Sequence, residues 1–467
     1  MRLSEYLDSL RGKRVAVIGI GVSNTPLIEL LLGYGISVTA CDKKERSAFG
    51  DLADRLEKWG CTLKLGEDYL KGLDQDIIFR SPGIRPDIPE FMEAREKGST
   101  ITSEMEVFFD VCPCHTIAVT GSDGKTTTTT IISEFLKAAG KTVYLGGNIG
   151  HPLLAEAGKM KEEDYAVLEL SSFQLLTMQK SPEIAVVTNL APNHLNVHKG
   201  MEEYVEAKAN IFLHQTGDQR VILNYDNEIT RAFAQRAVGK VTFFSRLHPE
   251  HGGVALEDGC IVVRDAASGS SRRVLPADSI AIPGVHNIEN YMAAIAAVDS
   301  LVPDEIIRQV AASFQGVEHR IELVRELHGV RYYNDSIASS PTRTTAGLRS
   351  FHQKVILIAG GKDKNISYAA LGPEIVEHVK FLILTGGDVL GSTVPKICTA
   401  VMNADGYDDK TLPILFIDDF EAAVQAAADH AQSGDVVLLS PASTSFDKFA
   451  NFMERGKKFK NIVNHMG

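Results

Sequence analysis

The chain has 467 residues, of which 44% are hydrophobic, and a formal net charge of −12 at pH 7. At about 100–200 residues per domain, this length predicts about three domains, each with a packed core. The negative charge argues against a nucleic-acid or anionic-membrane partner, while a local cationic pocket for a phosphorylated ligand stays open.

The cysteines and the lengths of the apolar runs indicate the cellular compartment of the protein. The chain has six scattered cysteines: Cys41, Cys61, Cys112, Cys114, Cys260 and Cys398. Only Cys112-Pro113-Cys114 is closely spaced, and this spacing matches neither a zinc knuckle nor a redox motif. We interpret all six as reduced thiols of a cytoplasmic protein. Residues 1–14 lack a signal-peptide core and no run approaches the ~20 apolar residues of a membrane span, so we expect no membrane insertion.

The N-terminal segment has the pattern of a nucleotide-binding βαβ unit. Residues 14–18 are a predicted buried strand that breaks at a glycine turn, 19–24, before a leucine-rich helix. A second strand, 36–41, ends in Asp42, which is placed for a ribose hydroxyl. Asn24 replaces the third glycine of the dinucleotide fingerprint, so a nicotinamide cofactor is not secured and a purely structural turn stays open. Further strands are predicted at 62–65, 76–79 and 100–102, and the turn Ser81-Pro82-Gly83 follows the second of these.

Residues 115–130, HTIAVTGSDGKTTTTT, carry the strongest signal. An apolar strand ends in the turn 121–124, and Lys125 with a row of threonines opens a helix. This order is typical of a phosphate-binding loop, because glycines let backbone N–H groups approach a polyphosphate, Lys125 reaches the outer phosphates, and a Thr hydroxyl can hold Mg²⁺. Only two residues separate the glycines, so ordinary kinase and GTPase families fit poorly. The alternative is a glycine turn with a surface lysine.

Polar residues follow the next strands. Glu169 comes directly after a strand and is placed to hold Mg²⁺, although alone it is as typical of a solvated carboxylate. His194 follows another strand end, and Lys208 lies on the helix after it, where the helix period alone predicts a surface lysine. The strands are predicted at 142–145, 166–168 and 184–188, with a glycine turn at 146–150.

Residues 221–274 predict a small antiparallel excursion from the central domain, punctuated by turn pairs such as Asp226-Asn227. An alanine-rich helix follows, to about residue 299. Asn287 and Asn290 are three apart on one face of it, suited to the edge of a base, while Asn287 fits a helix cap equally well.

From about residue 317, strands alternate with helices as in a second doubly wound sheet. A last segment, 445–457, mixes aromatic and charged residues at a helical period and should pack on this sheet. The strands are predicted at 330–333, 355–358, 381–384, 414–417 and 436–439, and polar groups follow three of them at 334–336, 360–364 and 440–443.

Three parts of the chain carry a family resemblance, namely the phosphate-binding loop with its flanking residues (120–127, called the cradle below), the segment 284–290 and His319-Arg320. In these parts the chain resembles the Mur ligase family, ATP-dependent amide ligases of peptidoglycan precursor synthesis. The resemblance covers the whole chain. It implies an α/β fold of three domains. These are a Rossmann-like UDP-substrate-binding domain (1–103), a central P-loop-type ATPase domain with a mostly parallel sheet (104–316), and a Rossmann-like C-terminal domain for the incoming amino acid (317–467).

Within the family, the motif ELSSFQL (169–175), Asp335-Ser336 and the segment 440–452 are typical of members that add D-glutamate to UDP-N-acetylmuramoyl-L-alanine. The resemblance therefore implies these two substrates, ATP and Mg²⁺ as cofactors, an acyl-phosphate intermediate and a monomer. The alternatives are a family member for another amino acid, folylpolyglutamate synthase, a nucleotide-dependent dehydrogenase, and a non-catalytic nucleotide-binding regulator.

The resemblance also implies site residues, position by position. The catalytic set is Lys125, His194, Lys208 and Arg320. The ATP set is Gly121, Ser122, Asp123, Gly124, Lys125, Thr126, Thr127, Asn287, Asn290, Arg320 and Asp335. The UDP-substrate set is Val22, Ser23, Asp42, Lys43, Gly83 and Asn148, and the D-glutamate set is Ser339, Lys364, Ser445, Phe446 and Phe452. The metal set is Thr126, Glu169, His194 and carbamylated Lys208.

Three positions depart from the family pattern. Asp123 stands where Asn is usual, Asn193 where Asp precedes the histidine, and residues 337–340 read Ile-Ala-Ser-Ser where better-known members read Lys-Ala-Thr-Asn. Asp123 adds negative charge beside a polyphosphate. Carbamylation of Lys208 is expected because a free lysine, with a reference pKa of about 10.4, is positively charged and cannot bind a metal.

Overall fold

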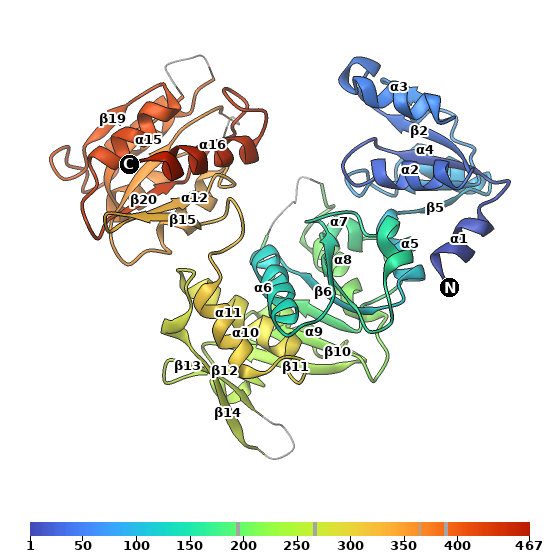
Figure 1. Cartoon of the computed structure of the whole chain (residues 1–467), viewed down its shortest axis with the longest axis horizontal. Helices are drawn as coiled ribbons and strands as arrows, with labels where there is room; N and C mark the ends of the chain where they lie inside the picture. The colour runs from blue at the N-terminus through green and yellow to red at the C-terminus, as the bar shows by residue number, and fades with distance from the viewer. Residues whose placement is uncertain (193–196, 265–268, 364–365, 387–390) are drawn as a thin grey trace. The chain divides into compact units, whose positions relative to one another are not determined.

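The computed structural model describes residues 1–192, 197–264, 269–363, 366–386 and 391–467. Helices and mostly parallel strands alternate, and the strands form three sheets (Figure 1). The chain divides into two compact units, residues 1–277 with 289–310 (unit 1) and residues 278–288 with 311–467 (unit 2). The predicted fold class is confirmed, whereas the domain bounds stay a prediction.

The first sheet of unit 1 is parallel, in the order β3-β2-β1-β4-β5. Its chain winds outward from β1 in both directions, so the loops after β1 and β4 meet at one edge. All five strands lie within one residue of their predicted bounds. The strands are β1 (Arg14–Ile18), β2 (Ser37–Asp42), β3 (Thr62–Leu65), β4 (Ile77–Arg80) and β5 (Thr100–Thr102), with helices α1 (Leu3–Ser9), α2 (Thr25–Gly33), α3 (Asp51–Lys58) and α4 (Pro89–Glu96).

The second sheet of unit 1 has nine strands, in the order β14-β13-β12-β11-β10-β9-β6-β8-β7. Its strands are β6 (His115–Thr120), β7 (Val143–Gly147), β8 (Tyr165–Glu169), β9 (Ile184–Val187), β10 (Arg220–Asn224), β11 (Lys240–Ser245), β12 (Val254–Glu257), β13 (Cys260–Arg264) and β14 (Ser271–Pro276). The accompanying helices are α5 (Glu104–Val111), α6 (Lys125–Ala138), α7 (Ser172–Leu175), α8 (Met201–Leu213), α9 (Glu228–Phe233), α10 (Val285–Val298) and α11 (Asp304–Ser313).

The prediction of an antiparallel excursion over 221–274 is wrong for its first half. β10 and β11 run parallel to β9 inside the main sheet, and only β12–β14 pair antiparallel. The error lies at Asp226-Asn227, which looks like a hairpin turn. Asn227 instead caps α9, because its side chain accepts a hydrogen bond from Thr230 N–H. The helix α9 then makes the parallel crossover between β10 and β11.

Unit 2 holds the third sheet, in the order β15-β16-β20-β17-β18-β19, with only β15 antiparallel to its neighbour. The predicted strands are confirmed, and β15 was missed. The strands are β15 (Glu322–Leu327), β16 (Val330–Asn334), β17 (Val355–Ala359), β18 (Val379–Leu384), β19 (Ile414–Phe416) and β20 (Val436–Leu439). The helices are α12 (Pro341–Leu348), α13 (Leu371–His378), α14 (Val394–Met402), α15 (Phe420–Asp429) and α16 (Phe452–His465).

Helices cover both faces of this third sheet. Along β17, Val355, Leu357 and Ala359 pack in the cluster with α12–α14, while Ile356 and Ile358 pack in the cluster with α15 and α16. This alternation follows from the two-residue period of a strand.

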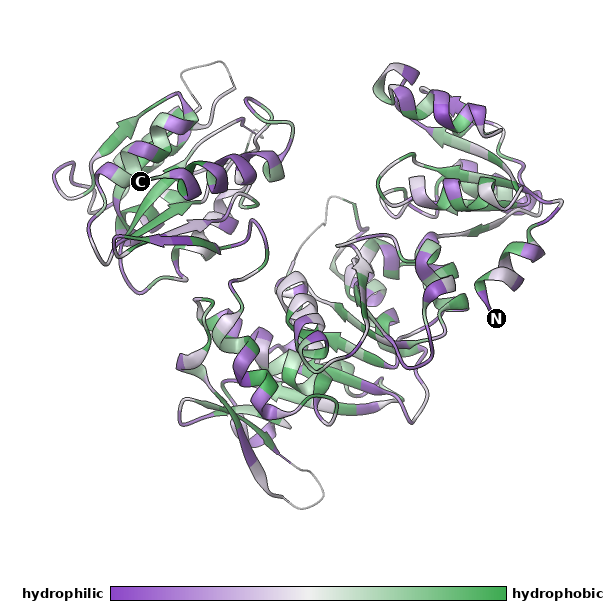
Figure 2. Ribbon diagram, viewed as in Figure 1, coloured by the Kyte–Doolittle hydropathy of each residue, from purple (hydrophilic) through white to green (hydrophobic). Residues whose placement is uncertain are grey.

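Figure 2 shows the inner strands in green and α16 mostly in purple. Phe459 and Val463 of α16 pack in the core of the sheet, whereas Glu454, Lys457 and Asn461 are exposed. The helical period predicted over 445–457 is present only from Phe452, where α16 begins.

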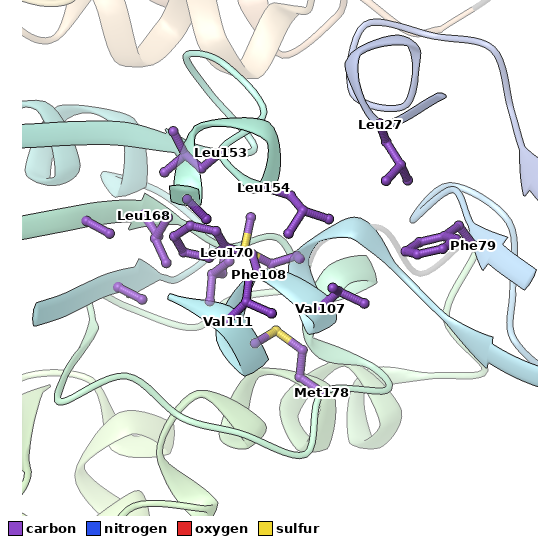
Figure 3. Packing of buried hydrophobic residues seen from close by; sticks show 14 of the residues in the cluster. Leu27, Phe79, Val107, Phe108, Val111, Leu153, Leu154, Leu168, Leu170 and Met178 are labelled. Carbon is purple, nitrogen blue, oxygen red and sulfur yellow. The ribbon is translucent and has the colours of Figure 1, made fainter. Parts of the chain in front are cut away.

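One buried cluster of unit 1 joins residues from both of its sheets. Leu27 of α2 and Phe79 of β4 belong to the same cluster as Phe108 of α5 and Leu168 of β8 (Figure 3). Burying side chains of this size contributes about 1.5–3 kcal/mol each. The cluster therefore ties α5 to the core beside β6, the strand that leads into the cradle.

All six cysteines are free thiols, as predicted. Among the helices that the structure describes, none is long and apolar enough to cross a membrane.

Glu104 should make the stability of unit 1 depend on pH. Its buried carboxylate accepts the Leu154 N–H at 2.9 Å, and burial raises its pKa from 4.5 to about 7. The folded state therefore binds the Glu104 proton more tightly than the unfolded chain does. Protonated Glu104 thus contributes to the free energy of unfolding below pH 4.5, and this contribution is lost as the pH rises through about 7. The loss is about 3 kcal/mol for a shift of this size. Glu104→Gln keeps an acceptor oxygen but does not titrate.

Urea unfolding followed by Trp59, the single tryptophan, measures this difference between pH 5 and 8. We expect wild type to lose stability relative to Glu104→Gln across that window. If the free energy of unfolding changes with pH by the same amount in wild type and Glu104→Gln, Glu104 is not the titrating group.

Candidate active site

The loop between β6 and α6 requires glycine at both ends. Gly124 has a φ of 77° and caps α6. A Cβ on Gly121 would lie 1.9 Å from Thr188 Oγ1, and one on Gly124 would lie 2.3 Å from Asn290 Oδ1. The absence of side chains therefore lets the backbone close tightly over the N-terminus of α6, which is the geometry of a phosphate cradle.

The segment that follows β9 and a side chain of α8 hold this loop in place. Ser122 Oγ donates to Ala191 O at 2.9 Å and lies 2.9 Å from Tyr204 Oη. The Asp123 N–H donates to Asn189 Oδ1 at 3.0 Å, while the Asp123 side chain is exposed. The extra negative charge noted in the sequence thus lies on the open side of the loop.

Two lysines converge on one carbonyl oxygen. Lys125 Nζ donates to Gly121 O and to Ser122 O, each at 3.0 Å. Lys208 Nζ donates to the same Gly121 O at 2.9 Å and to Thr120 Oγ1 at 3.0 Å. The cradle therefore carries a partly buried cation at its mouth and a second amine behind it.

Lys208 is only 1% exposed, so the interpretation as a surface lysine is wrong. Burial lowers the pKa of Lys208 well below its ordinary value, and the charge of Lys125 lowers it further, against the opposing pull of Glu169 and Asp123. Two ammonium groups that share one carbonyl repel each other strongly in a dry environment. The amine of Lys208 is therefore held toward its neutral form.

Thr126, Glu169 and Asn148 form one hydrogen-bonded row. Thr126 Oγ1 donates to Glu169 Oε2 at 2.6 Å, and Asn148 Nδ2 donates to Glu169 Oε1 at 2.7 Å. Glu169 is 2% exposed, so it is not a solvated carboxylate. Thr127 is buried in α6. A hydroxyl beside a carboxylate is a hard oxygen pair that fits Mg²⁺. Among the described residues, no three His, Cys, Asp or Glu side chains group as a metal site.

The predicted UDP-substrate residues of the first sheet lie at the end of β2 and in the loops after the neighbouring strands β1, β2 and β4. The Asp42 carboxylate accepts the N–H groups of Ile20 at 2.7 Å and Lys44 at 2.9 Å, so it fixes the glycine turn after β1. Asn24 donates to Ile18 O at 3.0 Å, which explains a side chain at the third glycine position. The exposed members are Val22, Ser23, Lys43 and Gly83.

Asn290 lies against the cradle, and Asn287 does not cap its helix. Asn290 Oδ1 accepts a hydrogen bond from Thr128 Oγ1 at 3.2 Å. The helix α10 begins at Val285, so Asn287 lies in its first turn and donates to Pro283 O at 2.6 Å.

In unit 2, Arg320 and Asp335 lie close enough to interact. Asp335 is fully buried, accepts from Ser440 Oγ at 2.8 Å, and has its pKa raised to about 7 by burial, an effect that the Ser440 bond and the charge of Arg320 oppose. The neighbours of Arg320 both have positive φ, 66° at His319 and 46° at Ile321. This backbone is strained for non-glycine residues and fixes the direction of the arginine.

The members of the predicted D-glutamate set that the structure describes lie after β16 and β20. Ser445 is 2% exposed, and its carbonyl accepts the Phe449 N–H at 2.8 Å in a single turn after β20. Phe446 is 63% exposed, and Phe452 starts α16 edge-on to His319 at 6.0 Å. Ser339 lies in the turn after β16. Lys364 of this set, and His194 and Asn193 near the metal set, lie outside the described residues.

Sequence reasoning missed Arg455. This arginine of α16 is 3% exposed and donates to Ser336 Oγ and O, Ser443 O and Thr444 O at 2.9–3.3 Å. Burial lowers its pKa to about 10. One guanidinium thus joins the ends of β16 and β20 to α16. One partner, Ser336, is 119 residues away, and the other two, Ser443 and Thr444, lie in the loop between β20 and α16. No spacing in the sequence therefore indicates these contacts.

Comparison with known proteins places these features in one family. Two family models match the chain, the Mur ligase middle domain over residues 119–298 and the Mur ligase glutamate ligase domain over residues 319–443. The chain is also 53% identical, over 466 residues, to the UDP-N-acetylmuramoylalanine–D-glutamate ligase of Acetivibrio thermocellus, covering 99% of this chain and 98% of that protein. The chain belongs to the Mur ligase family.

Solved Mur ligases show that the three-sheet architecture of this Mur ligase is shared. UDP-N-acetylmuramate–alanine ligase MurC of Thermotoga maritima matches with a TM-score of 0.60 at 18% identity, over 97% of this chain and 99% of that chain. MurF ligase of the same organism, solved in complex with ADP, matches with a TM-score of 0.57 at 20% identity, over 92% and 95%.

Arg455 should hold the unit 2 loops of this Mur ligase together. Arg455→Met should lower the free energy of unfolding by about 2–4 kcal/mol, since each buried acceptor left unsatisfied costs about 1–3 kcal/mol. The matched control is Arg349→Met, which removes an arginine that is 63% exposed in its ion pair with Glu374 and should change stability by far less, no more than about 1 kcal/mol. Urea unfolding followed by circular dichroism compares them, and equal midpoints would refute the bridging role of Arg455.

Proposed function

We propose that this Mur ligase joins D-glutamate to the terminal carboxyl group of UDP-N-acetylmuramoyl-L-alanine, with conversion of ATP to ADP and phosphate, in peptidoglycan precursor synthesis. The D-glutamate ligase at 53% identity over almost the full length supports this choice of substrates. The observation that carries the chemistry is the meeting of Lys125, Lys208 and the Thr126–Glu169 pair around one glycine loop.

The residues present fit ATP and Mg²⁺. Gly121 and Gly124 pack directly against Thr188 and Asn290, which keeps the loop tight at the N-terminus of α6, and this helix end supplies N–H groups to an anion. Thr126 and Glu169 would hold Mg²⁺, which supplies charge neutralisation to the phosphates. Lys125 would exchange its bonds to loop carbonyls for the outer phosphates. Asn290, which packs against Gly124, would hold the nucleotide.

The reaction needs no side-chain nucleophile. A carboxylate oxygen of the first substrate attacks the γ-phosphorus of ATP, a C–O–P bond forms, and the bond to the ADP oxygen breaks. The amine of D-glutamate then attacks the carbonyl carbon, loses a proton and expels phosphate. Both steps bring anions together, so catalysis consists mainly of positioning and charge neutralisation by Lys125 and Arg320.

Lys208 suits carbamylation because burial and the charge of Lys125 lower the pKa of its amine and so favour the neutral form. A neutral amine can attack carbon dioxide, form an N–C bond and release a proton, which leaves an anionic carbamate. Repulsion from Lys125 favours this product over the ammonium form, since the carbamate would attract Lys125. The carbamylated side chain, with His194, would complete the metal set.

We assign substrates to domains as the family resemblance implies, with UDP binding in residues 1–103, ATP in 104–316 and D-glutamate in 317–467. We also propose a cytoplasmic monomer. Support comes from the six free thiols, which are typical of a reducing compartment. The UDP-substrate residues are Val22, Ser23, Asp42, Lys43, Gly83 and Asn148; Asn287, Arg320 and Asp335 complete the ATP set; and Ser339, Lys364, Ser445, Phe446 and Phe452 contact D-glutamate.

Lys125→Ala should lower phosphate release by about 10²–10³-fold, the cost of removing one key charge stabiliser. The variant should stay folded, because Lys125 faces the cradle. Lys137→Ala is the matched control, since Lys137 lies on the same helix in an exposed pair with Glu134 and should keep full turnover. A variant Lys125→Ala that retains more than about a tenth of wild-type activity would contradict the cradle assignment.

Lys208→Ala should be nearly inactive and should regain part of its turnover in acetate or formate, because a short carboxylate can replace the oxygens of the carbamate. The same acids should not rescue Lys125→Ala, where the missing group is a cation. Phosphate release measured against acid concentration tests both variants. Equal responses of the two variants, or no response of Lys208→Ala, would argue against an oxygen ligand at this position.

A further inference from the structure

The segment Cys112-Pro113-Cys114 joins α5 to β6 and takes no part in the ligase mechanism. Its two sulfur atoms lie 3.4 Å apart, closer than any other contact between thiols that the structure shows among its six cysteines. Cys398, by comparison, has a thioether neighbour, Met402, at 3.6 Å but no second thiol.

Local backbone conformation brings the two thiols together. Cys112 ends α5 with extended φ and ψ of −65° and 120°, as expected for a residue before proline. In extended backbone, side chains two residues apart point to the same side. Pro113 fixes the φ angle between them, so the pair is held in place before any reaction.

The two thiols differ in access and in electronic state. Cys112 is half-buried, whereas Cys114 is 6% exposed and packs 3.9 Å from the Met160 sulfur. The contact between the two thiols lowers the pKa of Cys112, and the same contact together with burial raises the pKa of Cys114. Cys112 is thus the accessible nucleophile and Cys114 the shielded partner.

We propose that Cys112 and Cys114 form a peroxide-reactive dithiol, a modification site that closes reversibly to a disulfide. The Cys112 thiolate attacks one oxygen of a hydroperoxide, an S–O bond forms, the O–O bond breaks, and the second oxygen leaves as water or an alcohol after taking a proton. The Cys114 thiol then loses its proton and attacks the Cys112 sulfenic sulfur, which expels water. Sulfur is oxidised and the hydroperoxide is reduced.

The required motion is small. The sulfurs must approach by about 1.4 Å to reach the covalent distance of about 2.05 Å. A ring closed between residues two apart is strained, and strained disulfides are easily reduced. A dithiol reductant should therefore reopen the bond.

The first experiment treats the full-length protein with hydrogen peroxide and follows intact mass and thiol content. We expect a loss of two hydrogens and two thiols per chain, mapped to one peptide containing both cysteines and reversed by dithiothreitol. Persistent gain of oxygen on Cys112 alone, or oxidation no faster than at Cys398, would overturn the proposal.

Variants separate the two roles. Cys114→Ser should stop at the sulfenic acid of Cys112, which dimedone traps, whereas Cys112→Ser should lose the reaction at this site by at least about tenfold in rate. Cys398→Ser is the matched control and should still form the disulfide. Circular dichroism checks that each variant is folded, and dimedone labelling of wild type equal to that of Cys114→Ser would show that Cys114 does not resolve the sulfenic acid.

Discussion

The carbonyl oxygen of Gly121 accepts hydrogen bonds from both Lys125 and Lys208, and the active site depends on this shared contact. It places one amine at the mouth of the cradle and a second behind it, within the reach of mutual repulsion. Burial, together with this repulsion, lowers the pKa of Lys208 and so favours its neutral amine. In the proposed function, the cationic loop that favours a polyphosphate at Lys125 also favours the neutral form of the Lys208 amine.

Sheet topology explains why residues from distant parts of the chain can serve one reaction. In each parallel sheet, loops at the carboxyl ends of adjacent strands meet at one edge. The cradle follows β6, Glu169 ends the adjacent strand β8, and Asn189 follows β9 on the other side. In unit 2, Asp335 and Ser440 follow the paired strands β16 and β20. The buried strands thus position the polar and charged side chains that lie at their carboxyl ends.

Local signals in the sequence predicted much of this structure, and long-range contacts account for the rest. The glycine spacing of the cradle and the apolar runs of the strands are local features, so their elements lie where expected. The helix period could not show that Lys208 is buried, because its partners are 87 and 88 residues away. Asn227 was taken for a turn residue since turns and helix caps favour the same side chains.

Selection of the amino acid is the central claim, and a substrate panel tests it most directly. Purified protein, ATP, Mg²⁺ and UDP-N-acetylmuramoyl-L-alanine are combined in turn with D-glutamate, L-glutamate, D-aspartate, L-lysine and D-alanine, and phosphate and amide product are quantified together. The account predicts equal amounts of both products with D-glutamate and little of either otherwise. Preference for another amino acid would contradict the proposed activity, and phosphate release without any amino acid would contradict the coupled mechanism.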